Sequence, residues 1–188
     1  MKNRLDIYCV TDKDLDFLRD LDYKLAAVGK NNFSDQYIRC DQEDNIFYKE
    51  EYYSELTFHY WFWKNLLEKK NNNLWIGFCQ KRRFWLQSKN SSNNLLSKVP
   101  SNWKNYNAVI CKKINLGKPK LSKLFKRGWK NIIQKPNILY SDRNYNIELH
   151  FDLFHGFRNL QKAAELVKKE DRDEFIEYIK RTDLLILI

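Results

Sequence analysis

The stretch WIGFCQKRRFW, residues 75–85, decides the fold of this chain. Its first five residues are apolar and do not alternate with polar ones, a pattern typical of a strand that is buried on both faces of a sheet. The strand then runs into Gln80 and three adjacent cations, Lys81, Arg82 and Arg83. Three cations at the end of a buried strand indicate either a solvated edge or a binding site for an anion.

Upstream of this strand, strand-like and helix-like segments alternate. Residues 4–11 (RLDIYCVT) predict a first strand, residues 14–20 a short helix, and a second apolar strand or turn ends at Gly29 and Lys30. The clearest helix is expected over 50–69, because apolar residues recur there at steps of three and four. The residues on that face are Tyr53, Leu56, Tyr60, Trp63 and Leu67.

Downstream, the chain becomes basic and helical. An Asn- and Ser-rich loop (89–105) precedes a short strand expected over 107–114. A basic helix is expected over 118–133, with Pro119 at its start. The remaining segments predict helices over 145–169 and 171–181 and a strand over 183–188. The whole pattern predicts an α/β fold whose helices gather in the C-terminal part.

The composition fits one domain with a packed core. The chain has 188 residues, of which 43% are hydrophobic, and we expect an α/β part over 1–115 and a helical part over 116–188. No apolar stretch reaches about 18 residues and no basic-then-apolar leader opens the chain, so a cytoplasmic protein is expected. The four cysteines form no C-x-x-C pair. We expect them to be free thiols, mostly buried, rather than disulfides or zinc ligands.

The positive charge is concentrated in the middle of the chain. The stretch between Glu68 and Asp142 has no acidic residue and 17 Lys and Arg, whereas the rest holds 17 Lys and Arg against 24 Asp and Glu. Such a one-sided excess predicts an anionic partner, namely phosphate, nucleic acid or a membrane surface. The alternative is a basic protein whose charge serves only solubility.

Several polar residues are expected at the carboxyl ends of strands, where open α/β sheets bind ligands. They are Thr11, Asp12, Gly29 and the segment Gln80–Arg83. Guanidinium groups bind phosphate through paired hydrogen bonds, so Arg82 and Arg83 are candidates for a diphosphate site. Adjacent residues of a strand point to opposite faces, so at most one of the two would reach a ligand directly.

Other candidate residues have two interpretations each. Asp41, Glu43, Asp44 and Asn45 would hold a metal or a ribose, or would form the acidic approach to a helix. Glu55, in an aromatic helix, is either an exposed carboxylate or a base with a raised pKa.

Two residues near the C-terminal end are also candidates for acid–base chemistry. Asp152 and His155 are three residues apart and could meet on one helix face. No P-loop, dinucleotide-binding, zinc-protease or nucleophile-elbow motif is present.

Four segments, IYCVT, LAAVGK, DNIFYKEEYYSELTFHYWFWKN and WIGFCQKRRFW, occur in the order found in one bacterial family. The chain resembles the glycosyltransferases of capsule and exopolysaccharide gene clusters that were first catalogued as domain of unknown function 4422. The likeness covers residues 6–85, and its most specific part runs from Glu55-Leu56-Thr57 to Lys64-Asn65. Beyond residue 140 it rests mainly on His155 and the helices that follow.

The resemblance implies a nucleotide-sugar-binding fold of the glycosyltransferase-A type, with a Rossmann-like mixed sheet. The residues that would line the donor nucleotide are Thr11, Gly29, Asp44 and Asn45. Glu55, Lys64 and Asn65 would shape the same pocket, and Arg82 and Arg83 would meet the diphosphate. The family has His-Tyr where this chain has Gln80-Lys81, and its members usually continue past this chain's end, so the run 183–188 is expected to be the first strand of a further part.

The expected function is therefore transfer of a sugar from a nucleotide-diphosphate donor to a surface glycan or a lipid-linked acceptor. Glu55, Asp152 and His155 are the candidates for catalytic acid–base work. No Asp-x-Asp pair follows the strand that ends at Gln80, so no Mg²⁺ or Mn²⁺ ligand is assigned. The alternative function is a basic nucleic-acid-binding module without enzymatic activity.

The segment 118–133 has its own two interpretations. It would lie on the inner face of an anionic membrane with Phe125 and Trp129 inserted, or it would pack on the core with a solvated basic back.

Overall fold

The computed structural model describes residues 4–70, 74–87, 94–112, 114–117, 120–134, 136, 145–182 and 184–185. The chain divides into two compact units, Met1–Val109 and Ile110–Ile188, and each is described here by itself. The sequence predicts a boundary between the α/β part and the helical part at 115/116, close to this division.

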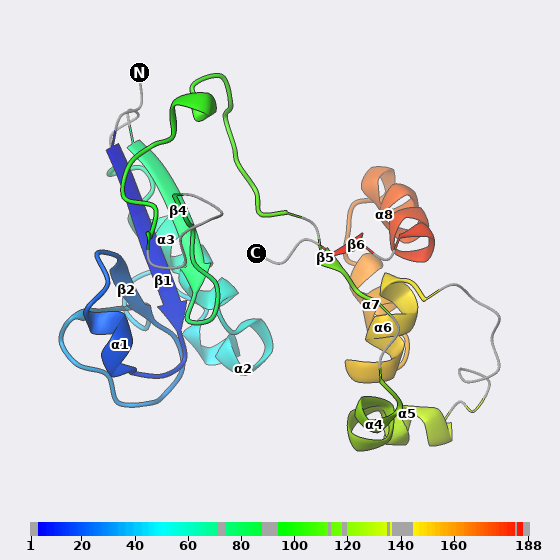
Figure 1. Ribbon diagram of the computed structural model, residues 1–188. Helices are drawn as coiled ribbons and strands as arrows, with labels where there is room; N and C mark the ends of the chain where they lie inside the picture. The colour runs from blue at the N-terminus through cyan, green and yellow to red at the C-terminus, as the bar shows by residue number, and fades with distance from the viewer. Residues whose placement is uncertain are drawn as a thin grey trace. The chain divides into compact units, whose positions relative to one another are not determined.

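The first unit is built on a four-stranded parallel sheet (Figure 1). Its strands are β1 (Arg4–Thr11), β2 (Lys24–Ala27), β3 (Tyr37–Arg39) and β4 (Leu74–Gln80), in the order β3-β2-β1-β4. This is the order of the first four strands of the Rossmann fold, in which the strand order reverses between the first and fourth strands. The two long strands expected from the sequence are confirmed as β1 and β4. The sheet is parallel throughout these strands, whereas the sequence predicts a mixed one.

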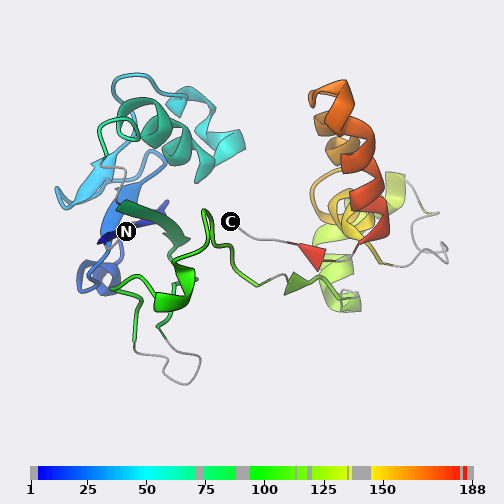
Figure 2. The same cartoon turned by 90° about the horizontal axis from the view of Figure 1, so that it is seen from above.

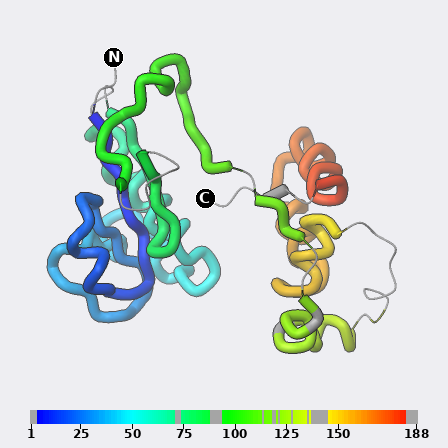
Figure 3. Tube along the Cα trace, viewed as in Figure 1, coloured from blue at the N-terminus to red at the C-terminus, as the bar shows by residue number. Residues whose placement is uncertain are grey.

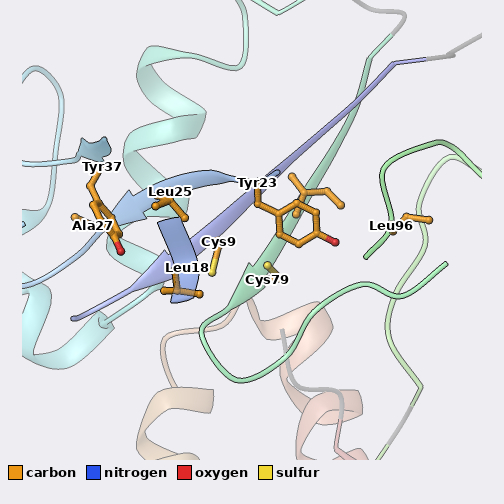
Figure 4. Packing of buried hydrophobic residues seen from close by; sticks show 9 residues of the cluster. Cys9, Leu18, Tyr23, Leu25, Ala27, Tyr37, Cys79 and Leu96 are labelled. Carbon is orange, nitrogen blue, oxygen red and sulfur yellow. The ribbon is translucent and has the colours of Figure 1, made fainter. Parts of the chain in front are cut away.

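Alternate residues of β1 supply the cores on the two faces of the sheet. Ile7 and Cys9 face a cluster that includes Leu18 of helix α1 (Asp16–Arg19), together with Cys79 and Leu96 (Figure 4). On the other face, Tyr8 and Val10 pack against aromatic residues of helix α3 (Leu56–Asn65). Figure 2 shows α3 on one side of the sheet, with α1 and the short 3₁₀ helix η2 (Ser101–Trp103) on the other. The result is a three-layer arrangement that leaves the carboxyl ends of the strands at one edge.

The helix expected over 50–69 is interrupted. The segment contains the 3₁₀ helix η1 (Phe47–Lys49), the short helix α2 (Glu50–Tyr53) and then α3. Ser54 separates α2 from α3 with φ 46° and ψ −123°, a conformation outside the helical region. The prediction of one continuous helix is therefore wrong, because a serine in this conformation cannot continue the helical hydrogen-bond pattern.

The face of α3 that packs on the sheet is different from the apolar face identified in the sequence. The buried residues are Thr57, Phe58, Trp61 and Phe62. Leu56, Trp63 and Leu67 are exposed large hydrophobic residues, and so is Tyr53 at the end of α2. The segment is apolar on two sides. Phe58 and Phe62 pack against Tyr8 and Phe78 of the sheet, and the ring centroids across this contact are 4.9–6.5 Å apart.

The second unit contains two short antiparallel strands and a group of helices. Strand β5 (Ile114–Asn115) pairs with β6 (Leu184–Leu185). The strand expected over 107–114 is wrong for residues 107–112, which form no strand, because only Ile114 and Asn115 find a partner strand. Of the run expected over 183–188, residues 183 and 186–188 lie outside the described residues.

The basic helix expected over 118–133 is present from Leu121 onward, whereas Lys120 precedes it. It consists of α4 (Leu121–Lys123), a π-helical turn η3 (Leu124–Gly128) and α5 (Trp129–Gln134). Pro119, its expected first residue, lies outside the described residues. Wide π-helical turns inside α-helices are rare and are often found at functional sites.

The helix expected over 145–169 is divided into α6 (Ile147–Phe154) and α7 (Asn159–Ala164). Gly156 (φ 103°) and Arg158 (φ 58°) have left-handed backbone conformations between them, which end α6 and make the prediction of one helix wrong. Helix α8 (Lys169–Arg181) agrees with the helix expected over 171–181. Helix α6 contacts the π-helical turn, α5, α7 and α8 and is the centre of this unit. No described helix is long and apolar enough to cross a bilayer.

Candidate functional site

Two opposite charges meet where the carboxyl ends of β1 and β4 lie side by side. Asp12 follows Thr11, the last residue of β1, and Lys81 follows Gln80, the last residue of β4. The Lys81 ammonium donates a hydrogen bond to Asp12 Oδ1 and forms an ion pair with it. Burial raises the pKa of Asp12, but the hydrogen bond and charge of Lys81 outweigh burial and hold that pKa below its usual value. An ionised carboxylate and an ammonium therefore occupy the point where the strand order reverses.

The side chain of Thr11 shapes the loop at this edge. Thr11 is buried, and its hydroxyl donates to the Lys13 carbonyl oxygen (2.8 Å) and accepts from the Lys13 amide (3.0 Å). The Thr11 carbonyl oxygen also accepts from the Val28 amide at 2.9 Å, which joins the loops after β1 and β2. Its hydroxyl is thus used inside the turn, in the manner of a Ser/Thr turn.

Gly29 lies on the same edge, in the loop after β2. Its φ of 85° favours glycine, and a Cβ there would lie 3.5 Å from Glu50 Oε1. Arg39, the last residue of β3, donates to the Gly29 carbonyl oxygen (3.3 Å) and to Asp41 Oδ2 (3.3 Å). The loop that contains Gly29 is therefore held beside Thr11. Arg39 and Glu50 also lie at this edge, and the sequence analysis did not identify either of them.

The three cations after β4 occupy a tight reverse turn rather than a strand. Gln80 and Arg83 exchange backbone hydrogen bonds of 3.3 and 3.0 Å, so that Lys81 and Arg82 are the two central residues of the turn (Figure 3). The side chains of Arg82 and Arg83 are exposed, and neither forms an ion pair with any other described residue. The expectation that strand alternation sends them to opposite faces is wrong, because the strand ends at Gln80 and the chain reverses there.

The acidic turn 41–46 is tied to α3 by hydrogen bonds. Asn65 donates to the Asp44 carbonyl oxygen at 2.8 Å, and the Tyr60 hydroxyl donates to Asp44 Oδ1 at 3.1 Å. Asn45 accepts from the Phe47 amide at 3.0 Å, at the start of η1. Asp44 and Asn65 are therefore in direct contact, and this hydrogen bond, with that of Tyr60, holds the loop to the helix.

Lys64 has a different position from its neighbour Asn65. Its side chain is exposed, and its ammonium lies 4.3 Å from the centroid of the Trp63 ring. This cation–π contact places Lys64 on the outward aromatic side of α3, next to an exposed tryptophan.

Glu55 is half-buried at the start of α3, and His59 lies one turn further along. The His59 ring is 4.4 Å from the Phe78 ring of β4. Burial lowers the pKa of His59, and the negative charge of Glu55 offsets part of that effect. The histidine is therefore neutral at neutral pH, with a carboxylate within reach as its electrostatic partner.

Asp152 and His155 belong to the second unit. Asp152 is buried, and its Oδ1 accepts from the Arg158 amide at 2.8 Å across the left-handed turn after α6. The His155 ring lies 4.6 Å from the Phe151 ring and 5.9 Å from the His150 ring. The Tyr145 hydroxyl lies 2.6 Å from His150 Nδ1. These histidines form an aromatic cluster within the helical unit.

No group of three or more His, Cys, Asp and Glu side chains that could hold a metal ion occurs in the described part of the chain. The groups at the β1–β4 edge that can bind an anion include Lys81 and the exposed guanidinium groups of Arg82 and Arg83. Asp12 is the carboxylate that lies beside Lys81 at this edge. The position of Asp12 directly after a strand could be read from the sequence. Its contact with Lys81 could not, because the two residues are 69 positions apart.

A cavity of about 270 Å³ lies away from this edge, beside the first halves of β1 and β4. Its walls are largely apolar and include Trp75, Trp85 and Trp103. The lining of the cavity does not include Asp12 or Lys81, so the candidate site lies outside this cavity.

The arrangement so far defines an α/β protein with a charged edge at the carboxyl ends of β1 and β4. The family model described as "Domain of unknown function (DUF4422)" matches residues 6–186. The chain belongs to this family, and the match includes the helical second unit as well as the sheet. No curated protein and no solved structure matches the chain.

Proposed function

We propose that this protein is a glycosyltransferase with a fold of the glycosyltransferase-A type, which uses a nucleotide-diphosphate sugar as its donor. The observation that carries the proposal is the pairing of Asp12 with Lys81 at the β1–β4 edge, next to the exposed Arg82. Open α/β sheets bind nucleotides at this point, and the cations there have the charge that a diphosphate needs. The acceptor in this proposal is a surface glycan or a lipid-linked glycan on the cytoplasmic side of the membrane.

The donor diphosphate would compete with Asp12 for Lys81. In the proposed complex, Lys81 and Arg82 contact the phosphate oxygens and stabilise the leaving nucleoside diphosphate as the glycosidic bond breaks. The carboxylate of Asp12 is then released to accept a hydrogen bond from the ribose. Glu55 is the candidate base in the first unit, and Asp152 and His155 are the candidates in the second.

A thermal-shift and calorimetric panel tests this proposal with UDP, GDP, CDP and their sugar conjugates, each with and without Mn²⁺. The chain should be stabilised by one nucleoside diphosphate, and Lys81→Ala combined with Arg82→Ala should weaken its binding by about tenfold or more. Arg4→Ala is the matched control, because Arg4 is an exposed cation at the opposite end of β1. Equal affinity of the double variant and the parent would refute the role of this edge.

The same panel includes a short single-stranded RNA, because the basic excess between residues 68 and 142 also fits a nucleic-acid-binding protein. Stabilisation by RNA alone, lost at high salt, would favour that function over sugar transfer.

A further inference from the structure

The helix formed by α4, the π-helical turn and α5 carries an exposed apolar stripe. Phe125, Trp129 and Ile133 are four residues apart and have exposed fractions of 70%, 48% and 67%. Such large side chains, repeated on one side of a helix, normally pack against something. Within the second unit they remain uncovered.

The neighbouring side of this helix packs against α6, which fixes the direction of the stripe. Asn131 donates to the Leu153 carbonyl oxygen of α6 at 2.9 Å. Gly128 is buried, and a Cβ there would lie 3.3 Å from the same carbonyl oxygen, so the helix rests closely on α6. Leu124 and Ile132 lie beside Gly128 on this packed side and are half-buried. The stripe therefore cannot turn inward without breaking the contact with α6.

The charge around the stripe indicates what covers it. Lys126 and Lys130 directly follow Phe125 and Trp129, are exposed, and flank the stripe. The Lys130 ammonium lies 5.9 Å from the Trp129 ring centroid. The chain has no acidic residue between positions 68 and 142, so this surface has no internal counter-charge from its own segment.

We propose that this helix binds the surface of an anionic lipid bilayer, with Phe125, Trp129 and Ile133 inserted among the lipids and the lysines at the head groups. A helix with an apolar stripe and a lysine-rich polar side is the structure that binds in this way. RNA is a weaker fit, because Ile133 extends the stripe without offering a ring for a base to stack on. The proposal does not rest on sugar transfer and is tested without a donor.

The test is co-sedimentation of the full chain with vesicles of phosphatidylcholine alone or of phosphatidylcholine with one third phosphatidylglycerol. The parent should bind the anionic vesicles about tenfold more strongly than the neutral ones, and Phe125→Ser with Trp129→Ser should reduce that binding by about tenfold or more. Lys126→Gln with Lys130→Gln should reduce it several-fold and weaken its dependence on salt.

Trp63→Ser is the matched control, because Trp63 is 55% exposed in the first unit and has a lysine beside it in the same way. This variant should bind vesicles like the parent. Equal binding to neutral and anionic vesicles, undiminished binding of the Phe125/Trp129 double variant, or an equal loss in Trp63→Ser would each overturn the proposal. A fall of several degrees in the thermal midpoint of the double variant would show that protein covers the stripe, and would also overturn it.

Discussion

Lys81 and Asp12 form an ion pair across the carboxyl ends of β4 and β1, although 69 residues separate them in the sequence. The pair joins the two strands between which the order of the sheet reverses. Among the residues that the structure describes, it is the ion pair that joins the end of β1 to the basic turn after β4. Its contribution to stability can be measured independently of any ligand.

Lys81→Gln should lower the free energy of unfolding at pH 7 by about 0.5 kcal/mol, because solvent screens a pair in which Asp12 is partly exposed. The pKa of Asp12 is lower in the folded chain than in the unfolded chain, where it is about 3.9. The stabilisation is therefore present above about pH 4 and is lost as the pH falls through the lower folded value. Urea unfolding at pH 7 and at pH 3 checks this, with Asp12→Asn and the double variant completing a cycle. A difference that does not shrink as the pH is lowered from 7 to below 4 would contradict the assignment.

Ser54 lies between α2 and α3 with a positive φ that only glycine adopts without strain. Ser54→Gly should therefore raise the free energy of unfolding by about 1 kcal/mol, measured by chemical denaturation. Ser122→Gly is the control, because Ser122 is an exposed residue of a helix, where glycine costs about 1 kcal/mol. If both substitutions destabilise the chain equally, the conformation of Ser54 is not strained.

The three histidines should all titrate below their ordinary pKa of 6.5. Burial is the main cause for each, and Lys123 lowers the pKa of both His150 and His155, with His155 also acting on His150. Because the folded values are depressed, these histidines contribute stability above pH 6.5 that is lost as the pH falls toward the folded values. NMR titration of the imidazole protons measures each pKa. Tyr145→Phe removes the hydroxyl next to His150 Nδ1 and serves to assign that signal, and a value above 6.5 for His150 would contradict its burial.

Thiol reactivity should separate the cysteines into two classes. Cys9, Cys40 and Cys79 are buried, and burial raises the pKa of Cys40 to about 12, whereas Cys111 is half-buried. A disulfide reagent should modify one thiol quickly in the native chain and the other three only as fast as the first unit unfolds. Cys111→Ser should abolish the fast phase. Any fast thiol in that variant would show that the sheet is open to the reagent.

The strands of the fold could be predicted where the sequence signal is local. The apolar runs of β1 and β4 and the helical period after residue 120 identify their elements without tertiary information. The face of α3 could not be predicted, because both of its sides are apolar and only the fit of Phe58 and Phe62 against the sheet selects one. The break at Ser54 could not be predicted, since a non-glycine residue occupies the positive-φ position there. The break after α6 did have a signal in the sequence, Gly156, which the prediction of one helix over 145–169 did not use.

Only those residues of the candidate site that have a local sequence signal could be predicted. Thr11, Gly29 and the basic turn could be placed at the carboxyl edge because each follows a strand. Arg39 and Glu50 could not, because their contacts with Gly29 depend on how β3 and α2 pack around it.

The sheet of the first unit has a consequence for the order in which the chain folds. All four strands and both of their hydrophobic clusters come from residues before 104, and the ion pair of Asp12 with Lys81 forms within the same segment. Domains emerge from the ribosome from their N-terminal end and generally fold as units. The first unit can thus complete its core and the charged edge at the ends of β1 and β4 while the helical unit is still being synthesised.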